Sequence, residues 1–322
     1  MAALLLTGPA TAMALDTDRP DVREFIDEMV AEHAYEREAL VSALREAESQ
    51  GRILEAIARP AERTLSWAEY RNIFLTGERI RAGAEFWQEH RETLERISAD
   101  TGVPPEILVG IIGVETYFGR ITGNYRVLDA LATLAFDYPP RSRFFRRELA
   151  QFLLLVREEG MDVAAATGSY AGAMGAPQFM PSSYRAYAVD SNEDGRRDIW
   201  NNWTDVIGSV ANYFVEHGWR PGEEVVSRAT LAAGWTGETP RNSLKTEETI
   251  GSLSASGVMF ATDLGGDERG SLLKYDGADG DEYWVGFHNF FVITRYNRSV
   301  MYALAVHQLG QEIALEVNRD PA

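Results

Sequence analysis

Glu115 is the first residue whose surroundings suggest chemistry. It lies beside one apolar stripe with helical spacing, which is formed by Ile107, Ile111, Val114 and Phe118. A carboxyl group at the edge of such a stripe is partly desolvated, and desolvation raises the pKa of a carboxyl so that it can donate a proton. The alternative is a glutamate at the helix rim that pairs with Arg120. The pattern alone leaves both interpretations open.

A loop of alternating oxygen-bearing side chains is the second feature. Asp190, Asn192, Asp194, Gly195, Arg196 and Asp198 occupy positions 1, 3, 5, 6, 7 and 9 of a loop. This spacing is typical of an EF-hand calcium loop, in which glycine allows the sharp bend and position 7 offers its backbone carbonyl. Asn201 stands at position 12, where a bidentate glutamate is expected, and Asp205 is the nearest later carboxylate. We expect a structural Ca²⁺ held by a longer loop that Asp205 closes; an Asx turn without an ion is the alternative.

A segment rich in glycine and alanine lies before this loop. It reads SYAGAMGAPQFMPSS and contains Ser169 and Gln178. Small residues allow a polymer chain to approach the backbone, and the Gln178 amide can bond a ligand amide or hydroxyl. A tight contact between helices would need the same small residues.

The elements that must position these residues are mostly helical. Helical periodicity covers 20–98, 126–136, 143–158, 203–217 and 298–316. Pro104, Pro105 and Glu106 mark the start of a further helix that ends near Gly119. Between residues 222 and 292 the pattern changes to short β-prone runs: EVVSRATL, GVMFATDL, SLLKYD, EYWVGF and FFVITRY. The fold class is therefore mainly α (α+β), with a small antiparallel β subdomain.

Charge and composition exclude several classes of function. The chain has 322 residues, with 31 Lys and Arg against 49 Asp and Glu, and a net charge of −18. Such a chain is poorly suited to bind nucleic acid or an anionic membrane through phosphates. It has no cysteine, which excludes disulfides, thiolate metal sites and a cysteine nucleophile. Residues 1–15 form a short apolar run that resembles a truncated secretory signal without its basic start.

Together these segments resemble the lytic murein transglycosylase B family, glycoside hydrolase family 103. The matching stretches are GVPPEILVGIIGVETYFGR, RVLDALATLAFDYPPRSRFFRRELAQFLLL, GSYAGAMGAPQFMPSSYRAYAVDSNEDGRRDIWNNWTDVIGSVANYFVEHGW and FFVITRYNRSVMYALAVHQLG. The resemblance covers roughly residues 20–315 and is weakest at 222–285. It implies a lysozyme-like catalytic core at 101–221, an α-helical domain from 16–100 plus 298–322, and a small β subdomain at 222–297.

The resemblance also implies roles for individual residues. Glu115 falls on the family's single catalytic acid/base. Glycan-binding positions fall on Tyr70, Ser169, Gln178, Tyr213, Tyr296, Asn297 and Tyr302. The calcium loop falls on Asp190, Asn192, Asp194, Arg196 and Asp205, and the family also closes this loop late. Some members carry a lipid on a cysteine that this chain lacks, so the resemblance implies a soluble periplasmic form, without an organic cofactor. No stretch after residue 15 reaches 18 apolar residues, so we expect no membrane span, and we expect a monomer because no clear exposed apolar stripe stands out.

The implied substrate is the peptidoglycan glycan strand, cleaved at the β-1,4 bond between N-acetylmuramic acid and N-acetylglucosamine in wall turnover. Most glycosidases use two carboxylates, and the nearest other candidates are Asp129 and Asp137, for which capping or solvation is the alternative. We expect Arg120, Arg141 and Arg295 to reduce the negative potential of the groove. Two other functions stay open: a hydrolase with a second carboxylate, and a non-catalytic peptidoglycan-binding protein.

Overall fold

The computed structural model describes residues 13–58 and 65–319. The interpretation of residues 1–15 as an export signal lies mostly outside this range; Met13–Ala14 forms β1, and Leu15 is buried. The contacts within the chain divide it into two compact units. The first comprises Met1–Ala61 and Thr122–Ala186, and the second comprises Glu62–Ile121 and Tyr187–Ala322. We call them unit 1 and unit 2. The domain boundaries expected from the sequence stay a prediction.

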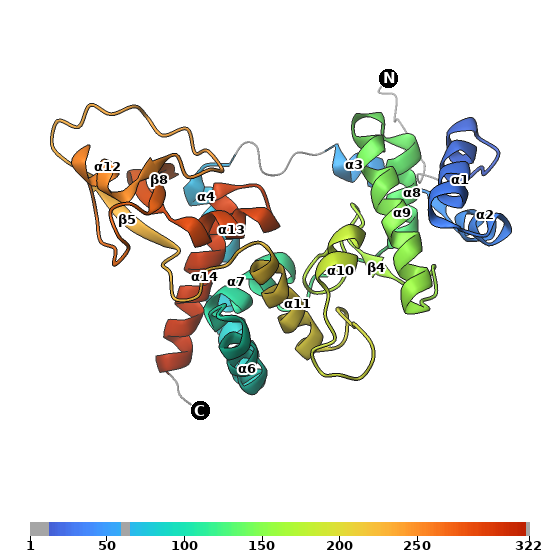
Figure 1. Cartoon of the computed structure of the whole chain (residues 1–322), viewed down its shortest axis with the longest axis horizontal. Helices are drawn as coiled ribbons and strands as arrows, with labels where there is room; N and C mark the ends of the chain where they lie inside the picture. The colour runs from blue at the N-terminus through green and yellow to red at the C-terminus, as the bar shows by residue number, and fades with distance from the viewer. Residues whose placement is uncertain (1–12, 59–64, 320–322) are drawn as a thin grey trace, which may run out of the picture. The chain divides into compact units, whose positions relative to one another are not determined.

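Unit 1 is a helical body with two short antiparallel ribbons. Its elements are β1 (Met13–Ala14), α1 (Pro20–His33), α2 (Arg37–Arg45), β2 (Glu48–Ser49), α3 (Gly51–Ile57), β3 (Tyr125–Arg126), α8 (Val127–Asp137), η1 (Pro139–Arg141), α9 (Ser142–Glu159), β4 (Thr167–Gly168) and α10 (Pro181–Tyr187), which reaches one residue into unit 2. Strands β1 and β2 pair, as do β3 and β4. Helices α8 and α9 pack side by side (Figure 1) and bury an almost continuous apolar surface.

Unit 2 combines a helical body with a five-stranded sheet. Its helices are α4 (Trp67–Phe74), α5 (Gly77–Glu89), α6 (Arg91–Thr101), α7 (Pro105–Thr116), α11 (Trp203–Glu216), α12 (Ile250–Ala255), α13 (His288–Tyr296) and α14 (Val300–Arg319). Its strands are β5 (Val226–Leu231), β6 (Glu248–Thr249), β7 (Val258–Phe260), β8 (Arg269–Gly277) and β9 (Gly280–Gly286), antiparallel in the order β6-β8-β9-β5-β7. Their core includes Val258, Leu272, Val285 and Phe287.

One expected strand is a helix. The run FFVITRY lies in α13, where Phe290, Phe291, Val292, Ile293 and Thr294 are all buried. A short run that begins with several consecutive apolar residues does not reveal its period, so its β-branched residues favoured the wrong element here. The other β-prone runs overlap β5, β7, β8 and β9. Helices occupy most of the described residues in the expected helical ranges, although the range 20–98 also contains β2.

Helices α7 and α14 approach each other closely at two glycines, and Figure 1 shows the two helices next to each other. A Cβ at Gly110 would lie 2.5 Å from the Val306 carbonyl oxygen, and one at Gly310 would lie 2.1 Å from the Glu106 carbonyl oxygen. Any larger side chain would push the helices apart. This contact positions the end of α7 against the start of α14.

Among the described residues, no single helix is long and apolar enough to cross a membrane. The pair α6 and α7 satisfies that criterion jointly, but a bend of 116° separates the two helices.

Candidate active site

Glu115 lies on the last turn of α7, at the point where the helix ends in an unusual backbone turn. Tyr117, Phe118 and Gly119 follow it with φ angles of 52°, 57° and 79°. Left-handed conformation is unfavourable for residues with a Cβ, so packing must hold it. The Phe118 ring stacks on Phe86 at 5.5 Å between centroids, and the Thr116 hydroxyl accepts a bond from the Gly119 N–H. The chain is thereby turned away directly after the carboxylate.

Tyr302, on the first turn of α14, contacts the Glu115 carboxylate directly. Its hydroxyl donates a hydrogen bond of 2.6 Å to Glu115 Oε1, and the Tyr302 side chain is 2% exposed. Burial raises the pKa of Tyr302 well above its ordinary value, and the neighbouring Glu115 charge adds to the rise. The phenol therefore stays protonated and acts as a fixed donor to the carboxylate.

Three more tyrosines surround this pair within unit 2. Burial, followed by the charge of Glu115, raises the pKa of Tyr296 well above its ordinary range. The Tyr296 ring lies 4.7 Å from the Tyr213 ring, and the Tyr213 hydroxyl donates to the Arg295 carbonyl at 2.7 Å. Tyr70, on α4, is 2% exposed, and it lies close enough to Tyr302 to add to the rise in the pKa of the Tyr302 phenol. The structure thus gathers Tyr70, Tyr213, Tyr296 and Tyr302 about the end of α7.

Asn297 follows α13 directly and is partly exposed beside Tyr296. Sequence analysis did not single out Tyr187 and His217, whose rings pack against Tyr213 at 4.9 and 4.1 Å between centroids. His217 follows Tyr213 by four residues at the end of α11, so helical spacing could have indicated that contact. No local signal identifies Tyr187, because its proximity to Tyr213 follows from the fold of unit 2.

Ser169 and Gln178 belong to unit 1, where both shape the glycine-rich segment. The Ser169 hydroxyl accepts bonds from the N–H groups of Ala171 and Ala173. Gln178 has φ 53°, and its Nε2 donates to the Thr122 and Gly175 carbonyls at 3.0 and 2.9 Å. Its amide group is therefore held in place, with Oε1 as the remaining acceptor.

The glycines of this segment pack against the chain's own backbone and side chains. A Cβ at Gly168 would lie 2.1 Å from the Ala173 carbonyl oxygen, and one at Gly172 would lie 2.5 Å from Leu131 Cδ2. Gly168 therefore allows close packing within the loop, and Gly172 allows close packing of the loop on α8, so neither lies at a contact between two helices.

Asp129 and Asp137, the candidates for a second catalytic carboxylate, are hydrogen-bonded to other residues of unit 1. Asp129, which is 1% exposed, accepts from the Glu48 N–H and the Gln50 amide at 2.9 and 2.8 Å. Asp137 accepts from Arg19 at 2.7 Å and from the Ser49 hydroxyl at 2.6 Å. Both carboxylates thus tie the β1–β2 region to α8, which agrees with a structural role.

Arg120 and Arg141 occupy aromatic surroundings. Arg120 lies over the Tyr117 ring at 5.0 Å and within 3.9 Å of Glu85, and Arg141 lies over the Phe144 ring at 4.4 Å. Arg295 lies next to Tyr296 and is exposed.

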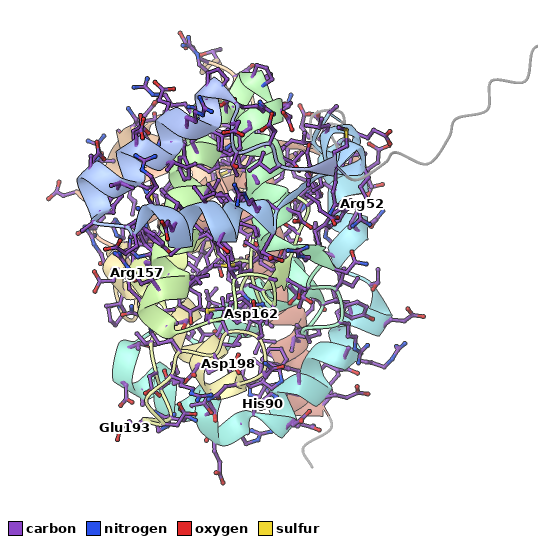
Figure 2. The ribbon with its side chains drawn as sticks, turned by 90° about the vertical axis from the view of Figure 1, so that its right-hand side faces the viewer. Arg52, His90, Arg157, Asp162, Glu193 and Asp198 are labelled. Atoms are coloured by element: carbon purple, nitrogen blue, oxygen red, sulfur yellow. The ribbon has the colours of Figure 1, made fainter. Side chains whose placement is uncertain are left out.

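The acidic loop is closed by hydrogen bonds to its own backbone. Asp190 accepts from the N–H groups of Asp194 and Gly195 at 3.1 and 2.7 Å, and Asn192 donates to Asp194 at 3.0 Å. Gly195 has φ 87° and provides the sharp bend. Figure 2 shows the loop with Glu193 at its outer edge. These bonds from side-chain oxygens to backbone N–H groups are Asx turns.

Asp205 anchors this loop from inside the protein. It is fully buried and accepts from the N–H groups of Ser191 and Asp198 at 2.8 and 2.9 Å. Burial, together with the charge of Asp190, raises the pKa of Asp205. Within 13–58 and 65–319, no three His, Cys, Asp or Glu side chains converge as a metal site. The donor types suit Ca²⁺, which takes oxygen ligands, and a cation would offset the charge of Asp190 and Asp205.

The sequence and the fold match known proteins over most of the chain. The family model of the transglycosylase SLT domain matches residues 17–311. Membrane-bound lytic murein transglycosylase B of Escherichia coli (strain K12) is 44% identical over an alignment of 307 residues that covers 92% of this chain and 84% of that protein.

Solved structures agree with the mainly helical, lysozyme-like fold. Soluble lytic transglycosylase SltB1 from Pseudomonas aeruginosa is 50% identical with a TM-score of 0.86, covering 93% of this chain and 100% of that chain. The E. coli lytic transglycosylase Slt35 in complex with calcium is 44% identical with a TM-score of 0.85, covering 95% and 96%. SltB3 from P. aeruginosa in complex with NAG-anhNAM-pentapeptide is 28% identical with a TM-score of 0.79, covering 91% and 78%. The chain belongs to the SLT-domain transglycosylase family, and it is a lytic murein transglycosylase that acts on peptidoglycan.

Proposed function

We propose that Glu115 is the single catalytic acid/base and that the enzyme cleaves the β-1,4 bond between N-acetylmuramic acid and N-acetylglucosamine to leave a 1,6-anhydromuramyl end. The observation that carries this proposal is the 2.6 Å hydrogen bond from the buried Tyr302 phenol to Glu115 Oε1. It fixes the orientation of one carboxyl group among tyrosines that offer rings and hydroxyls to a sugar.

The proposed reaction balances without water. Glu115 first donates its proton to the glycosidic oxygen, and the bond from this oxygen to the muramyl anomeric carbon breaks. The substrate's own 2-acetamido carbonyl stabilises the positive charge on that carbon. The ionised Glu115 then takes the proton of the sugar 6-hydroxyl as its oxygen attacks the anomeric carbon. One carboxylate suffices, since it serves as acid and then as base.

The remaining predicted residues would bind the glycan. In unit 2, Tyr70, Tyr213, Tyr296 and Asn297 offer ring faces, hydroxyls and an amide to the sugars near Glu115. In unit 1, Ser169 and Gln178 would also bind glycan, with Gln178 Oε1 accepting from a sugar amide or hydroxyl. These assignments rest on the family resemblance and on the chemistry of the side chains.

Product analysis tests this proposal. Purified murein is digested with the wild type, with Glu115→Gln and with the control Glu85→Gln, which changes an exposed carboxylate in the same unit. The wild type and the control should release muropeptides lighter by one water than the hydrated species, and Glu115→Gln should release none. Hydrated products would indicate a hydrolase with a second carboxylate. Bound but uncleaved murein with all three proteins would indicate a binding protein.

We also propose that the acidic loop binds a structural Ca²⁺ through Asp190, Asn192, Asp194, the Arg196 carbonyl and Asp205. The spacing of oxygen donors around Gly195 and the buried charge of Asp205 support this proposal. On binding the ion, Asp190 and Asp194 would give up hydrogen bonds from backbone N–H groups and would coordinate Ca²⁺ instead. The solved Slt35 structure in complex with calcium is consistent with it.

Thermal unfolding with and without chelator tests the calcium proposal. Free Ca²⁺ at 100 times its Kd should stabilise the wild type by about 2.7 kcal/mol. Asp190→Asn should lose this calcium-dependent stabilisation, whereas Asp100→Asn, an exposed carboxylate on α6, should retain it. A wild type whose melting temperature does not respond to Ca²⁺ would contradict the proposal.

We further infer that the enzyme works in the periplasm, where its substrate lies, as an exported, soluble monomer. Fractionation of cells should then release it with the periplasmic contents rather than with membranes. Gel filtration should give the mass of one chain.

A further inference from the structure

A pocket with a strongly basic lining lies in unit 2. It has a volume of about 550 Å³ and is lined by His217, Ser243, Leu244, Lys245, Thr294, Arg295 and Arg298. We call it the basic pocket. None of these lining residues is acidic, although the chain carries 49 acidic residues against 31 basic ones. The lining is therefore opposite in sign to the protein as a whole.

The cations of the basic pocket are not neutralised by the protein. Within 13–58 and 65–319, the side chains of Lys245, Arg295 and Arg298 form no ion pair, and all three are exposed. Other arginines of unit 2 do have acidic partners, as Arg220 does with Glu223 and Glu268. Three unpaired cations at one cavity repel one another, and an anionic ligand would remove that repulsion.

His217 adds a fourth polar group to this lining. Its Nδ1 lies 2.7 Å from the Tyr213 carbonyl oxygen, so Nδ1 carries the hydrogen. Nε2 is then the ring atom that can meet a ligand. The Leu244 side chain and the buried Thr294 supply an apolar contact and a hydroxyl at the same cavity.

Two residues of the basic pocket, His217 and Arg295, contact Tyr213, one of the tyrosines around Glu115. The Tyr213 hydroxyl donates to the carbonyl of Arg295, and the Tyr213 ring stacks on His217 at 4.1 Å between centroids. Tyr213 also contacts Tyr296, whose pKa the charge of Glu115 raises. A polymer bound at Glu115 could therefore reach the basic pocket with a side branch.

We propose that the basic pocket binds the carboxylates of the peptide stem that branches from the muramyl residue of the substrate. This inference rests on the proposed cleavage at Glu115, because it places the muramyl sugar beside Tyr296. The stem consists of small amino acids and several carboxylates. It matches a cavity with three cations, a leucine side chain and two hydroxyl groups, and guanidinium groups bind carboxylates with paired hydrogen bonds.

Kinetics with two substrates test this proposal. One substrate is murein with its stems. The other is the same murein after amidase treatment, which keeps the sugar chain and the lactyl carboxylate but removes the peptide carboxylates. The double variant Arg295→Gln/Arg298→Gln should raise KM about tenfold on the first substrate. On the second substrate it should change KM less than about twofold. The matched control is Arg81→Gln, an exposed arginine on α5 outside this pocket, and it should change neither value.

A binding measurement without turnover provides the second readout. The isolated stem tetrapeptide should bind the Glu115→Gln protein in calorimetry, more weakly as salt rises, and its fully amidated form should not bind. Lys245→Gln offers a milder variant if the double variant unfolds. Equal losses on both murein substrates, no loss on either, or tighter binding of inorganic phosphate than of the peptide would overturn the proposal. A wild type without anhydro products on either substrate would instead contradict the proposed cleavage.

Discussion

The hydroxyl of Tyr302 provides the sharpest test of the active-site geometry. Tyr302→Phe keeps the buried ring and removes the donor that lies 2.6 Å from Glu115 Oε1. A hydrogen bond to a charged group contributes about 1.5–3 kcal/mol. Since about 1.4 kcal/mol corresponds to a factor of ten, kcat/KM should fall roughly 10- to 100-fold.

The pH dependence separates a role in catalysis from a role in folding. Without the Tyr302 hydroxyl, the ionised form of Glu115 loses a hydrogen bond that favours it. The limb of the pH–rate profile that reports ionisation of Glu115 should therefore move to higher pH. The profile is measured from initial rates of release of soluble muropeptides by the wild type and the variant.

Tyr275→Phe is a matched control for this experiment. Tyr275 is also a buried tyrosine of unit 2, and its hydroxyl donates to the Val300 carbonyl at the start of α14. Its loss should cost about 1 kcal/mol of stability and leave the pH–rate profile in place. The reasoning would be refuted if Tyr302→Phe kept kcat/KM within about threefold of the wild type, or if both variants moved the profile equally.

Two further predictions concern stability. Gly310→Ala places a Cβ 2.1 Å from the Glu106 carbonyl oxygen, so we expect a loss of about 1–3 kcal/mol in urea unfolding and a loss of activity as α14 shifts from α7. Gly265→Ala, with no atom within 4 Å of its Cβ, should show neither. Burial lowers the pKa of His307 from 6.5 to about 4, so the unfolded state takes up a proton at higher pH than the folded state. Stability should therefore fall as the pH drops from 6.5 towards 4, by up to about 3 kcal/mol at pH 4, and His307→Gln should remove this dependence; an unchanged pH dependence in that variant would contradict the assignment to His307.

The helix that carries Glu115 could be placed from the sequence, whereas the turn that ends it could not. Pro104 and Pro105 start α7, as the pattern predicts, but the helix ends at Thr116 instead of running through Phe118 to Gly119. Tyr117 and Phe118 adopt left-handed backbone conformation, which residues with a Cβ avoid in isolation. Their conformation depends on packing with Phe86, which a local pattern does not contain.

The tyrosine cluster illustrates the same limit. Tyr302 follows Glu115 by 187 residues in the chain, yet its hydroxyl bonds the carboxylate. Spacing along the chain predicts contacts only within one helix or strand pair. The family resemblance named Tyr302 as a site residue, and the bond to Glu115 follows from the close packing of α7 on α14 at Gly110 and Gly310.

The distribution of carboxylates bears on the number of groups that take part in cleavage. Asp129 and Asp137 are used in bonds to Glu48, Gln50, Ser49 and Arg19 within unit 1. If either acted as nucleophile or base, those bonds would have to break during each cycle, at a cost of desolvated polar groups. Glu115 instead bonds a tyrosine, which can remain its donor in both protonation states of the carboxyl. A reaction in which the substrate supplies both the stabilising carbonyl and the nucleophile therefore makes fewer demands on this structure than hydrolysis with a second carboxylate.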